Sequence, residues 1–114
     1  MANTDIVGIW RLVAIERPTA DGSVARDDAP HGFLLYDASG WFAESFSTHG
    51  PDGNVLTVLY CGTWETDGDS VFHIPAMHAD PANIGKRLQR QFVVDGDRFT
   101  LISGPVRLHG ERLR

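Results

Sequence analysis

The sequence has one cysteine, no basic run and no long apolar stretch, and each of these absences excludes a class of protein. Cys61 cannot form an internal disulfide, and it lacks the partner cysteines of a zinc site. The net charge of −5 is spread over the 114 residues without a cluster of Lys or Arg, which argues against nucleic acid as a partner. Residues 1–5 are polar and show no signal-peptide or membrane-span pattern, so we expect a cytoplasmic protein with no membrane partner.

The composition is that of an ordinary folded domain. Apolar residues make up 42% of the chain and charged residues 22%, both close to the averages of soluble globular proteins. A chain of this length encloses one hydrophobic core. We therefore expect residues 1–114 to form a single domain.

Turn-forming residues recur at short intervals, and the runs between them are rich in β-branched and aromatic residues, which is typical of an all-β protein. Asp37 to Gly40 predicts a tight hairpin, whereas Pro18 ends the first run and residues 19–30 indicate a loop. Residues 78–85 indicate a second, wider loop. The expected strands are residues 8–17, 32–36, 41–47, 55–65, 70–77, 86–94, 98–103 and 106–114.

Eight antiparallel strands with short connections have two common arrangements, a closed up-and-down barrel and a two-sheet sandwich. The barrel leaves no exposed strand edge, and with eight strands its interior holds either packed side chains or one small ligand. The chain shows no strand-helix-strand pattern that would indicate a parallel sheet.

Four segments, in this order and spacing, resemble the bacterial lipocalin-like domain family: GIWRLV at 8–13, GFLLYDASG at 32–40, YCGTWE at 60–65 and DGDRFTL at 95–101. The resemblance implies an eight-stranded antiparallel lipocalin-like β-barrel. It implies little about activity, because the family is mostly of unassigned function and its fold relatives include carriers and enzymes. Only residues 48–54 occupy the place of a longer, partly helical insertion in the family, so we expect a pocket that is more open or covered by a partner subunit.

Trp10 is expected to fill one end of such a barrel, with a cation from the last strand, Arg112 or Arg114, stacked on its ring. A comparable Trp and Arg pair is structural in lipocalins, so the resemblance implies a structural role here as well.

Glu44 lies between Phe42 and Phe46, so a strand with this face inward would hold the carboxylate in an apolar wall. Burial would then raise its pKa and suit it to general acid or base chemistry. If Trp41 and Ala43 face inward instead, Glu44 is a solvated strand residue. Alternation alone leaves both orientations open, because each face carries aromatic residues.

His73 and Arg90 are the other candidate catalytic residues. His73 occupies a strand without another ionisable group and is either a proton carrier or a hydrogen-bonded structural residue. A histidine on this strand also recurs in the resembled family. Arg90 shares a face with Leu88 and Phe92, so its guanidinium could bind a carboxylate, phenolate or enolate oxygen, or pair with Glu44.

No metal or cofactor site is expected. The spacing of the five histidines matches no known ligand cluster, and His73 and His78 should diverge because they differ in strand parity and Pro75 lies between them. The chain has no nucleophile elbow and no glycine-rich phosphate loop.

Two functions of different classes remain. The first is a barrel that binds a small hydrophobic or amphipathic molecule in an interior pocket. The second is a cofactor-independent isomerase, cyclase or lyase in which His73 or Glu44 moves a proton and Arg90 steadies an oxyanion. The expected pocket lining comprises Phe33, Tyr36, Phe42, Phe46, Tyr60, Trp64, Met77, Leu88 and Phe92.

Ile9, Val13 and Ile15 alternate with Trp10 along the first strand. If Trp10 points inward, these three side chains point outward and form an apolar strip on the surface. Apolar strips of this kind usually belong to interfaces, so we expect a homodimer.

Overall fold

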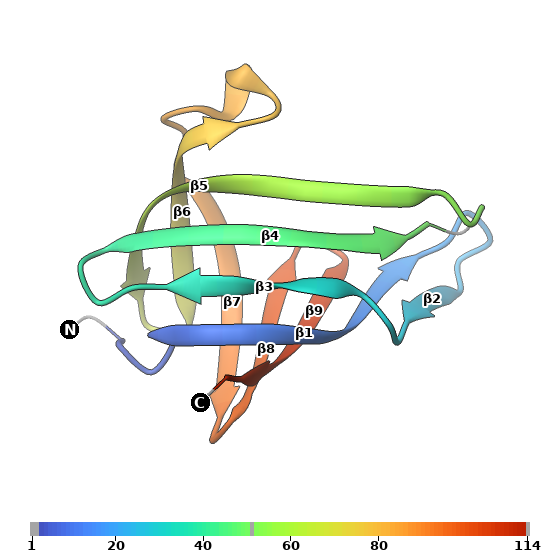
Figure 1. Cartoon of the computed structure of the whole chain (residues 1–114), viewed down its shortest axis with the longest axis horizontal. Helices are drawn as coiled ribbons and strands as arrows, with labels where there is room; N and C mark the ends of the chain where they lie inside the picture. The colour runs from blue at the N-terminus through green and yellow to red at the C-terminus, as the bar shows by residue number, and fades with distance from the viewer. Residues whose placement is uncertain (1–2, 51, 114) are drawn as a thin grey trace.

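The structure is a computed structural model that describes residues 3–50 and 52–113, which form nine strands and one short 3₁₀ helix (Figure 1). Bends at the predicted turn residues separate the strands. The elements are β1 (Gly8–Pro18), β2 (Val24–Asp27), β3 (His31–Tyr36), β4 (Trp41–His49), β5 (Val55–Asp67), β6 (Ser70–His78), η1 (Pro81–Asn83), β7 (Leu88–Asp95), β8 (Arg98–Ser103) and β9 (Val106–Arg112).

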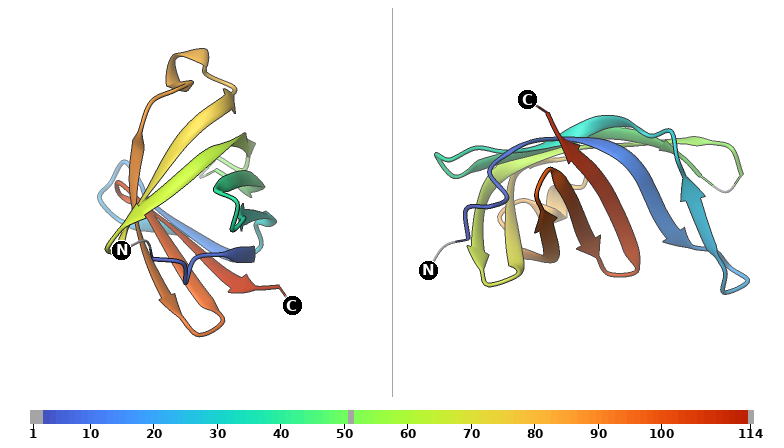
Figure 2. Two further views of the ribbon diagram at one scale, coloured as in Figure 1. Left: turned by 90° about the vertical axis from the view of Figure 1, so that its left-hand side faces the viewer. Right: turned by 90° about the horizontal axis from the view of Figure 1, so that it is seen from below.

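The strands form one antiparallel sheet in the order β2-β1-β3-β4-β5-β6-β7-β8-β9, and β1 also pairs with β9. This pairing closes β1 and β3 to β9 into an eight-stranded barrel, which confirms the predicted fold class. The β4–β5 and β1–β2 hairpins extend beyond β8 and β9 at the same end of the molecule (Figures 1 and 2). We call this end the mouth.

The ninth strand, β2, was not expected, because residues 19–30 were predicted to be a loop. Val24 to Asp27 pair with the last residues of β1. The turn between them is held by Asp21, whose carboxylate accepts the hydroxyl and the N–H of Ser23. At the mouth, the Asp27 carboxylate accepts the hydroxyl of Thr48 at 2.7 Å and therefore ties β2 to the end of β4.

A bulge in β1 changes which residues face the core. Leu12 pairs with Gly110 and Ala14 with His109, so Val13 has no partner residue in β9. The inserted residue shifts the alternation by one, and Ile15 turns into the core, where it is 1% exposed. The expectation that Ile15 lies on the outer face is therefore wrong, whereas Ile9, at 40% exposed, does lie there.

A second bulge has the same effect in β6. Cys61 pairs with Met77 and Gly62 with Pro75, which leaves Ala76 without a partner residue in β5. Past this point the alternation reverses, so Met77 faces outward at 44% exposed and His78 turns inward.

Gly62 makes the second bulge possible. A Cβ atom at this position would lie 2.0 Å from the carbonyl oxygen of Ile74 and 2.7 Å from the amide nitrogen of Ala76, and both are main-chain atoms. Neither atom can move away without disrupting the β5–β6 pairing.

We therefore expect Gly62→Ala to lower the free energy of unfolding by about 3 kcal/mol, at the upper end for overpacking. Urea unfolding measures the change, with Cys61→Ala as the matched control, because that side chain lies on the outer face and its removal creates no clash. Equal stability of the two variants would show that the close approach of β5 and β6 at this point is not required.

The end of the barrel opposite the mouth is closed by Trp10, which is fully buried and stacks on Phe99 with ring centroids 5.0 Å apart. Its indole N–H donates to the carbonyl of Ile6 at 2.8 Å. The Arg112 guanidinium lies 4.1 Å from the centre of the Trp10 ring and donates to the carbonyl of Val7 at 2.6 Å. The predicted stacking of a cation on Trp10 is confirmed for Arg112, whereas Arg114 lies outside the described residues.

Candidate functional site

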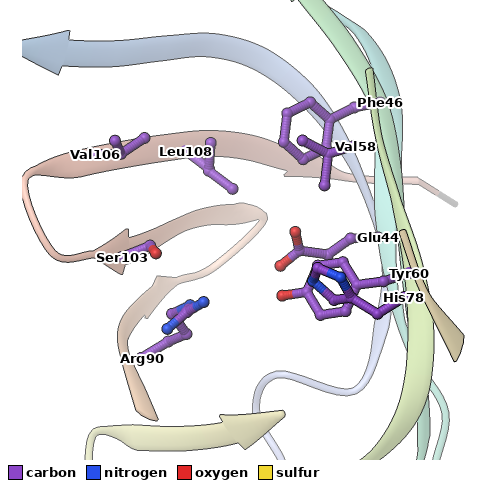
Figure 3. Close-up of a pocket in the computed structure, with 9 residues that line it drawn as sticks. All are labelled: Glu44, Phe46, Val58, Tyr60, His78, Arg90, Ser103, Val106 and Leu108. Carbon is purple, nitrogen blue, oxygen red and sulfur yellow. The ribbon is translucent and has the colours of Figure 1, made fainter. Parts of the chain in front are cut away.

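A cavity of about 320 Å³ opens between the two walls of the barrel (Figure 3). One wall is formed by β4 and β5 with the end of β6, and the other by β7, β8 and β9. Polar and apolar side chains occupy different parts of it, as the close-up shows. The lining residues are Glu44, Phe46, Val58, Tyr60, His78, Arg90, Ser103, Val106 and Leu108.

Glu44 faces this cavity from β4 and is 4% exposed. Of the two predicted orientations of β4, the structure therefore has Phe42, Glu44 and Phe46 inward, and Trp41 is 53% exposed on the outer face. Burial raises the pKa of Glu44 to about 7, although a hydrogen bond from Tyr60 and the charge of Arg90 act in the opposite direction. At neutral pH the group can therefore both accept and donate a proton.

His73 lies behind Glu44, with its Nδ1 3.5 Å from a carboxylate oxygen of Glu44, and is fully buried between two tyrosines. Its Nε2 is 2.6 Å from the hydroxyl of Tyr36, and its Nδ1 is 2.8 Å from the hydroxyl of Tyr60. Phe42 stacks on the imidazole at a centroid distance of 4.3 Å. Burial, together with the charge of Arg90, lowers the pKa of His73 to about 3, so the ring is neutral.

The hydrogen bonds determine where the single proton of neutral His73 lies. Among the described residues, Tyr36 has no other hydrogen-bond partner for its buried hydroxyl, so it donates to Nε2. Nδ1 then carries the proton and donates to the oxygen of Tyr60. The hydroxyl of Tyr60 is left to donate to Glu44, as the hydrogen bond that acts on the Glu44 pKa requires. The hydrogen bonds therefore run from Tyr36 to His73, from His73 to Tyr60 and from Tyr60 to Glu44, which faces the cavity.

The remaining polar groups of the cavity come from other strands. Arg90, on β7, is half-buried and points toward Tyr60 and Glu44 (Figure 3), and one of its nitrogens donates to the carbonyl of Gln89 at 3.0 Å. His78, at the end of β6, packs on Tyr60 with ring centroids 4.9 Å apart. Ser103 is the last residue of β8.

The apolar part of the cavity continues toward the mouth. Phe46, Val58, Val106 and Leu108 also line an adjoining cavity of 160 Å³, to which Ile15 and Leu56 contribute. Leu56 is 48% exposed, so the second cavity lies next to solvent. An apolar group held against Phe46 therefore has a path to the surface.

The structure brings together Glu44, Phe46, Tyr60 and Arg90 of the residues predicted for the site. Tyr36 and Phe42 lie one layer deeper and position His73, while Phe92 belongs to the core without lining the cavity.

Four further residues that were predicted to line the pocket do not line this cavity. The prediction is wrong for Phe33, because Leu34 and Tyr36 take the inward positions of β3. It is also wrong for Met77, because the bulge in β6 turns this side chain outward. Trp64 is partly buried near the β3–β4 turn, where it donates to the carbonyl of Asp37. Leu88 is half-buried opposite His73 at the start of β7.

Five lining residues were not predicted from the sequence: Val58, His78, Ser103, Val106 and Leu108. Val106 and Leu108 alternate on the last strand and could have been found by strand parity, as could Val58, which has the parity of Tyr60. His78 could not be found, because the bulge reverses its parity.

Among residues 3–50 and 52–113, no group of three or more His, Cys, Asp or Glu side chains could hold a metal ion. The same part of the chain contains no helix that is long and apolar enough to cross a membrane.

Comparisons with solved structures identify proteins of similar fold. A lipocalin-like protein from Bacteroides uniformis superimposes with a TM-score of 0.59 over 96% of this chain and 99% of its own, at 16% identity. An uncharacterized protein from Bacteroides eggerthii superimposes with a TM-score of 0.57 over 94% of this chain and 98% of its own, at 14% identity. No family model and no curated protein matches the sequence. The chain is therefore a lipocalin-like β-barrel, the class of fold that the sequence predicted.

Proposed function

We propose that this barrel binds a small apolar or amphipathic molecule in the cavity next to Glu44. The observation that supports this function is an interior space of about 320 Å³ that is lined by apolar side chains and has polar groups at one end. Ligand sites are typically concave, mostly apolar and supplied with a few placed polar groups, and their volumes run from about 300 to 1,000 Å³. The cavity lies at the small end of this range, which favours a small ligand.

Filling the cavity tests the proposal. We expect the neutral fluorescent probe N-phenyl-1-naphthylamine to gain fluorescence with the wild-type protein, and Val106→Trp to abolish the gain because the indole would occupy the apolar part of the site. Val93→Trp is the matched control, since Val93 is 57% exposed on β7 and lies away from the cavity. A probe that binds both variants equally would place its site elsewhere and contradict the proposal.

Acid-base catalysis on a small hydrophobic metabolite is the second candidate function. The observation that favours it is the carboxyl of Glu44, with a pKa of about 7, at the end of the hydrogen-bond chain through Tyr60, His73 and Tyr36. Such a group could take a proton from carbon beside a carbonyl and return it to another atom, while Arg90 stabilises the developing oxyanion.

Glu44→Gln distinguishes the two functions. A carrier keeps its affinity for an apolar probe within about threefold, because the amide fills the same space, whereas an enzyme loses turnover by orders of magnitude while still binding. His73→Gln is less informative, because it also breaks the hydrogen bonds of two buried tyrosines.

A further inference from the structure

The polar end of the cavity offers more hydrogen-bond donors than acceptors. Arg90 has one N–H on the carbonyl of Gln89 and another on the hydroxyl oxygen of Tyr60, and it presents the remaining N–H groups to the cavity. Nδ1 of His78 accepts the N–H of Asp80 at 2.9 Å, so the ring proton lies on Nε2. Ser103 adds a hydroxyl. Among the described residues that line the cavity, Glu44 is the one anionic acceptor, and it already accepts from Tyr60.

This excess of donors restricts the head group of a ligand. A carboxylate accepts up to about four hydrogen bonds and matches the fork of a guanidinium, whereas an alcohol oxygen accepts two and carries no charge. An ammonium group would donate and would face the positive charge of Arg90. The side chains beyond the polar end are mostly apolar, and polar groups return only at the mouth, where Arg17 and Thr48 also line the adjoining cavity. The part of the ligand next to the head group is therefore hydrocarbon.

We propose that the cavity selects an amphipathic monocarboxylic acid, with its carboxylate on Arg90, His78 and Ser103 and its hydrocarbon part directed past Val58 and Leu108 toward Leu56. This inference rests on the proposed binding function and names its ligand class. Glu44 in its protonated form adds a fourth donor to the bound carboxylate.

Protonation of Glu44 makes binding dependent on pH. An ionised Glu44 would repel the ligand, so the affinity for the acid should fall as pH rises through 7, while the affinity for a neutral ligand should not. The other titratable or charged groups packed around Glu44 are Tyr36 on β3, Tyr60 on β5, His73 and His78 on β6, and Arg90 on β7. The lining residues from β8 and β9 are not ionisable.

Decanoic acid and 1-decanol, which have the same chain length, test the head group. We expect decanoate to displace N-phenyl-1-naphthylamine about tenfold more effectively than decanol at pH 6, because hydrogen bonds to a charged group are the stronger ones. Arg90→Gln should remove this advantage of the acid over the alcohol. Ser103→Ala, which removes a single hydroxyl, should reduce the advantage of decanoate over decanol.

The outcomes separate the two levels of the proposal. Equal displacement by acid and alcohol in the wild type, or a preference for the acid that survives Arg90→Gln, would refute the carboxylate inference while leaving the binding function in place. Failure of the probe to bind the wild type at all would refute the binding function itself.

The outer surface of β3, β4 and β5 is a separate feature. We define the β3–β5 outer face by the outward side chains at 33–35, 41–47 and 55–63, none of which is Asp, Glu, Lys or Arg: Phe33, Leu35, Trp41, Ala43, Ser45, Ser47, Val55, Thr57, Leu59, Cys61 and Thr63. Polar and charged side chains border this face, with His31, His49, Glu65 and Asp67 at the strand ends and Arg11 opposite Phe33 on β1. In the strand register, one row across it continues to Ile9 on β1 and to Met77 on β6. Among the exposed large apolar residues are Ile9, Phe33, Trp41, Val55, Leu59 and Met77.

The size and shape of this face match an interface between copies. Six large apolar side chains that are roughly half exposed present on the order of 500 Å² of apolar surface, given about 150–250 Å² for a whole aromatic side chain. A standard interface buries about 800 Å² per partner, of which about 65% is apolar in homodimers. A groove of about 380 Å³ runs beside Phe33 over the small residues Ser45 and Ser47 and can receive a bulky side chain.

We infer that the β3–β5 outer face binds a second copy of this chain about a twofold axis. In such an interface the same surface meets itself, so a centre without charged side chains avoids like-charge contacts, while the charged residues remain at its border. The homodimer expected from the sequence is thus proposed on a different surface, since Ile15 is in the core and only Ile9 adjoins this face.

Sedimentation velocity at about 20 µM tests this interface, because a complex of micromolar Kd is largely assembled there. We expect the wild type and the control Val93→Lys to sediment as dimers and Leu59→Lys to sediment as a monomer, since its ammonium would lie in an apolar contact. A monomeric wild type, or a Leu59→Lys variant that remains a dimer, would overturn the inference.

Discussion

Replacing Trp10 by Ala is expected to lower the free energy of unfolding by about 4 kcal/mol, as large-to-small substitutions of buried aromatic residues do. The indole is fully buried, stacks on Phe99 and donates to the carbonyl of Ile6. Its loss leaves a cavity at the closed end and removes the surface on which Arg112 rests. Urea unfolding followed by circular dichroism measures the change.

Trp41→Ala is the matched control for this substitution. Trp41 is the same residue type on β4, but it is 53% exposed on the outer face. Its removal should cost less than about 1 kcal/mol when the protein is monomeric, as surface substitutions do. A Trp10 variant no less stable than the Trp41 variant would show that the closed end does not depend on the indole.

Replacing Glu44 by Gln is expected to change how stability depends on pH. The folded pKa of Glu44, about 7, lies above the unfolded value of 4.5, so the folded protein retains a proton that the unfolded chain releases. This contribution is fully present below pH 4.5 and is lost as pH rises to 7. The stability of the wild type relative to Glu44→Gln should therefore fall by about 3 kcal/mol over that interval.

His73 has the opposite dependence and conceals the effect of Glu44 in the wild type alone. Its folded pKa of about 3 lies below the unfolded value of 6.5, so its contribution is present above pH 6.5 and is lost as pH falls toward 3. Between pH 4.5 and 6.5 the two slopes cancel. Glu44→Gln keeps the histidine and removes the carboxyl, so the variant alone should gain stability with rising pH over this range.

Urea unfolding of both proteins at several pH values between 4.5 and 8 provides the comparison. Ser45→Ala, one position along β4 with its side chain on the outer face, removes no titratable group and should show a constant difference from the wild type. A constant difference for Glu44→Gln as well would mean that the carboxyl has an ordinary pKa and is open to water.

Much of the fold could be predicted from local signals, because the turn residues and the alternation of apolar residues both act over short distances. The β3–β4 hairpin follows from Asp37, whose carboxylate accepts the N–H of Ser39, and from Gly40, which adopts a positive φ of 97°. The two bulges could not be predicted, since each depends on pairing between distant strands. They account for the errors at Ile15, Met77 and His78.

The candidate site was predicted in part for the same reason. Glu44 could be placed between two apolar neighbours, but which face of β4 points inward is decided by packing against the whole barrel. The position of His73 between Tyr36 and Tyr60 joins three strands and has no signature in the sequence. Strand parity contains the signal for Val58 and Leu108, although the predicted lining did not include them.

The central claim is that the space beside Glu44 is a binding site for a small molecule. A crystal structure of the protein grown with decanoic acid tests it most directly. We predict density for the hydrocarbon chain between Val58 and Leu108 and for the carboxylate within hydrogen-bonding distance of Arg90. An interior filled by its own side chains, with decanoate absent or bound only to the outer surface, would contradict the account.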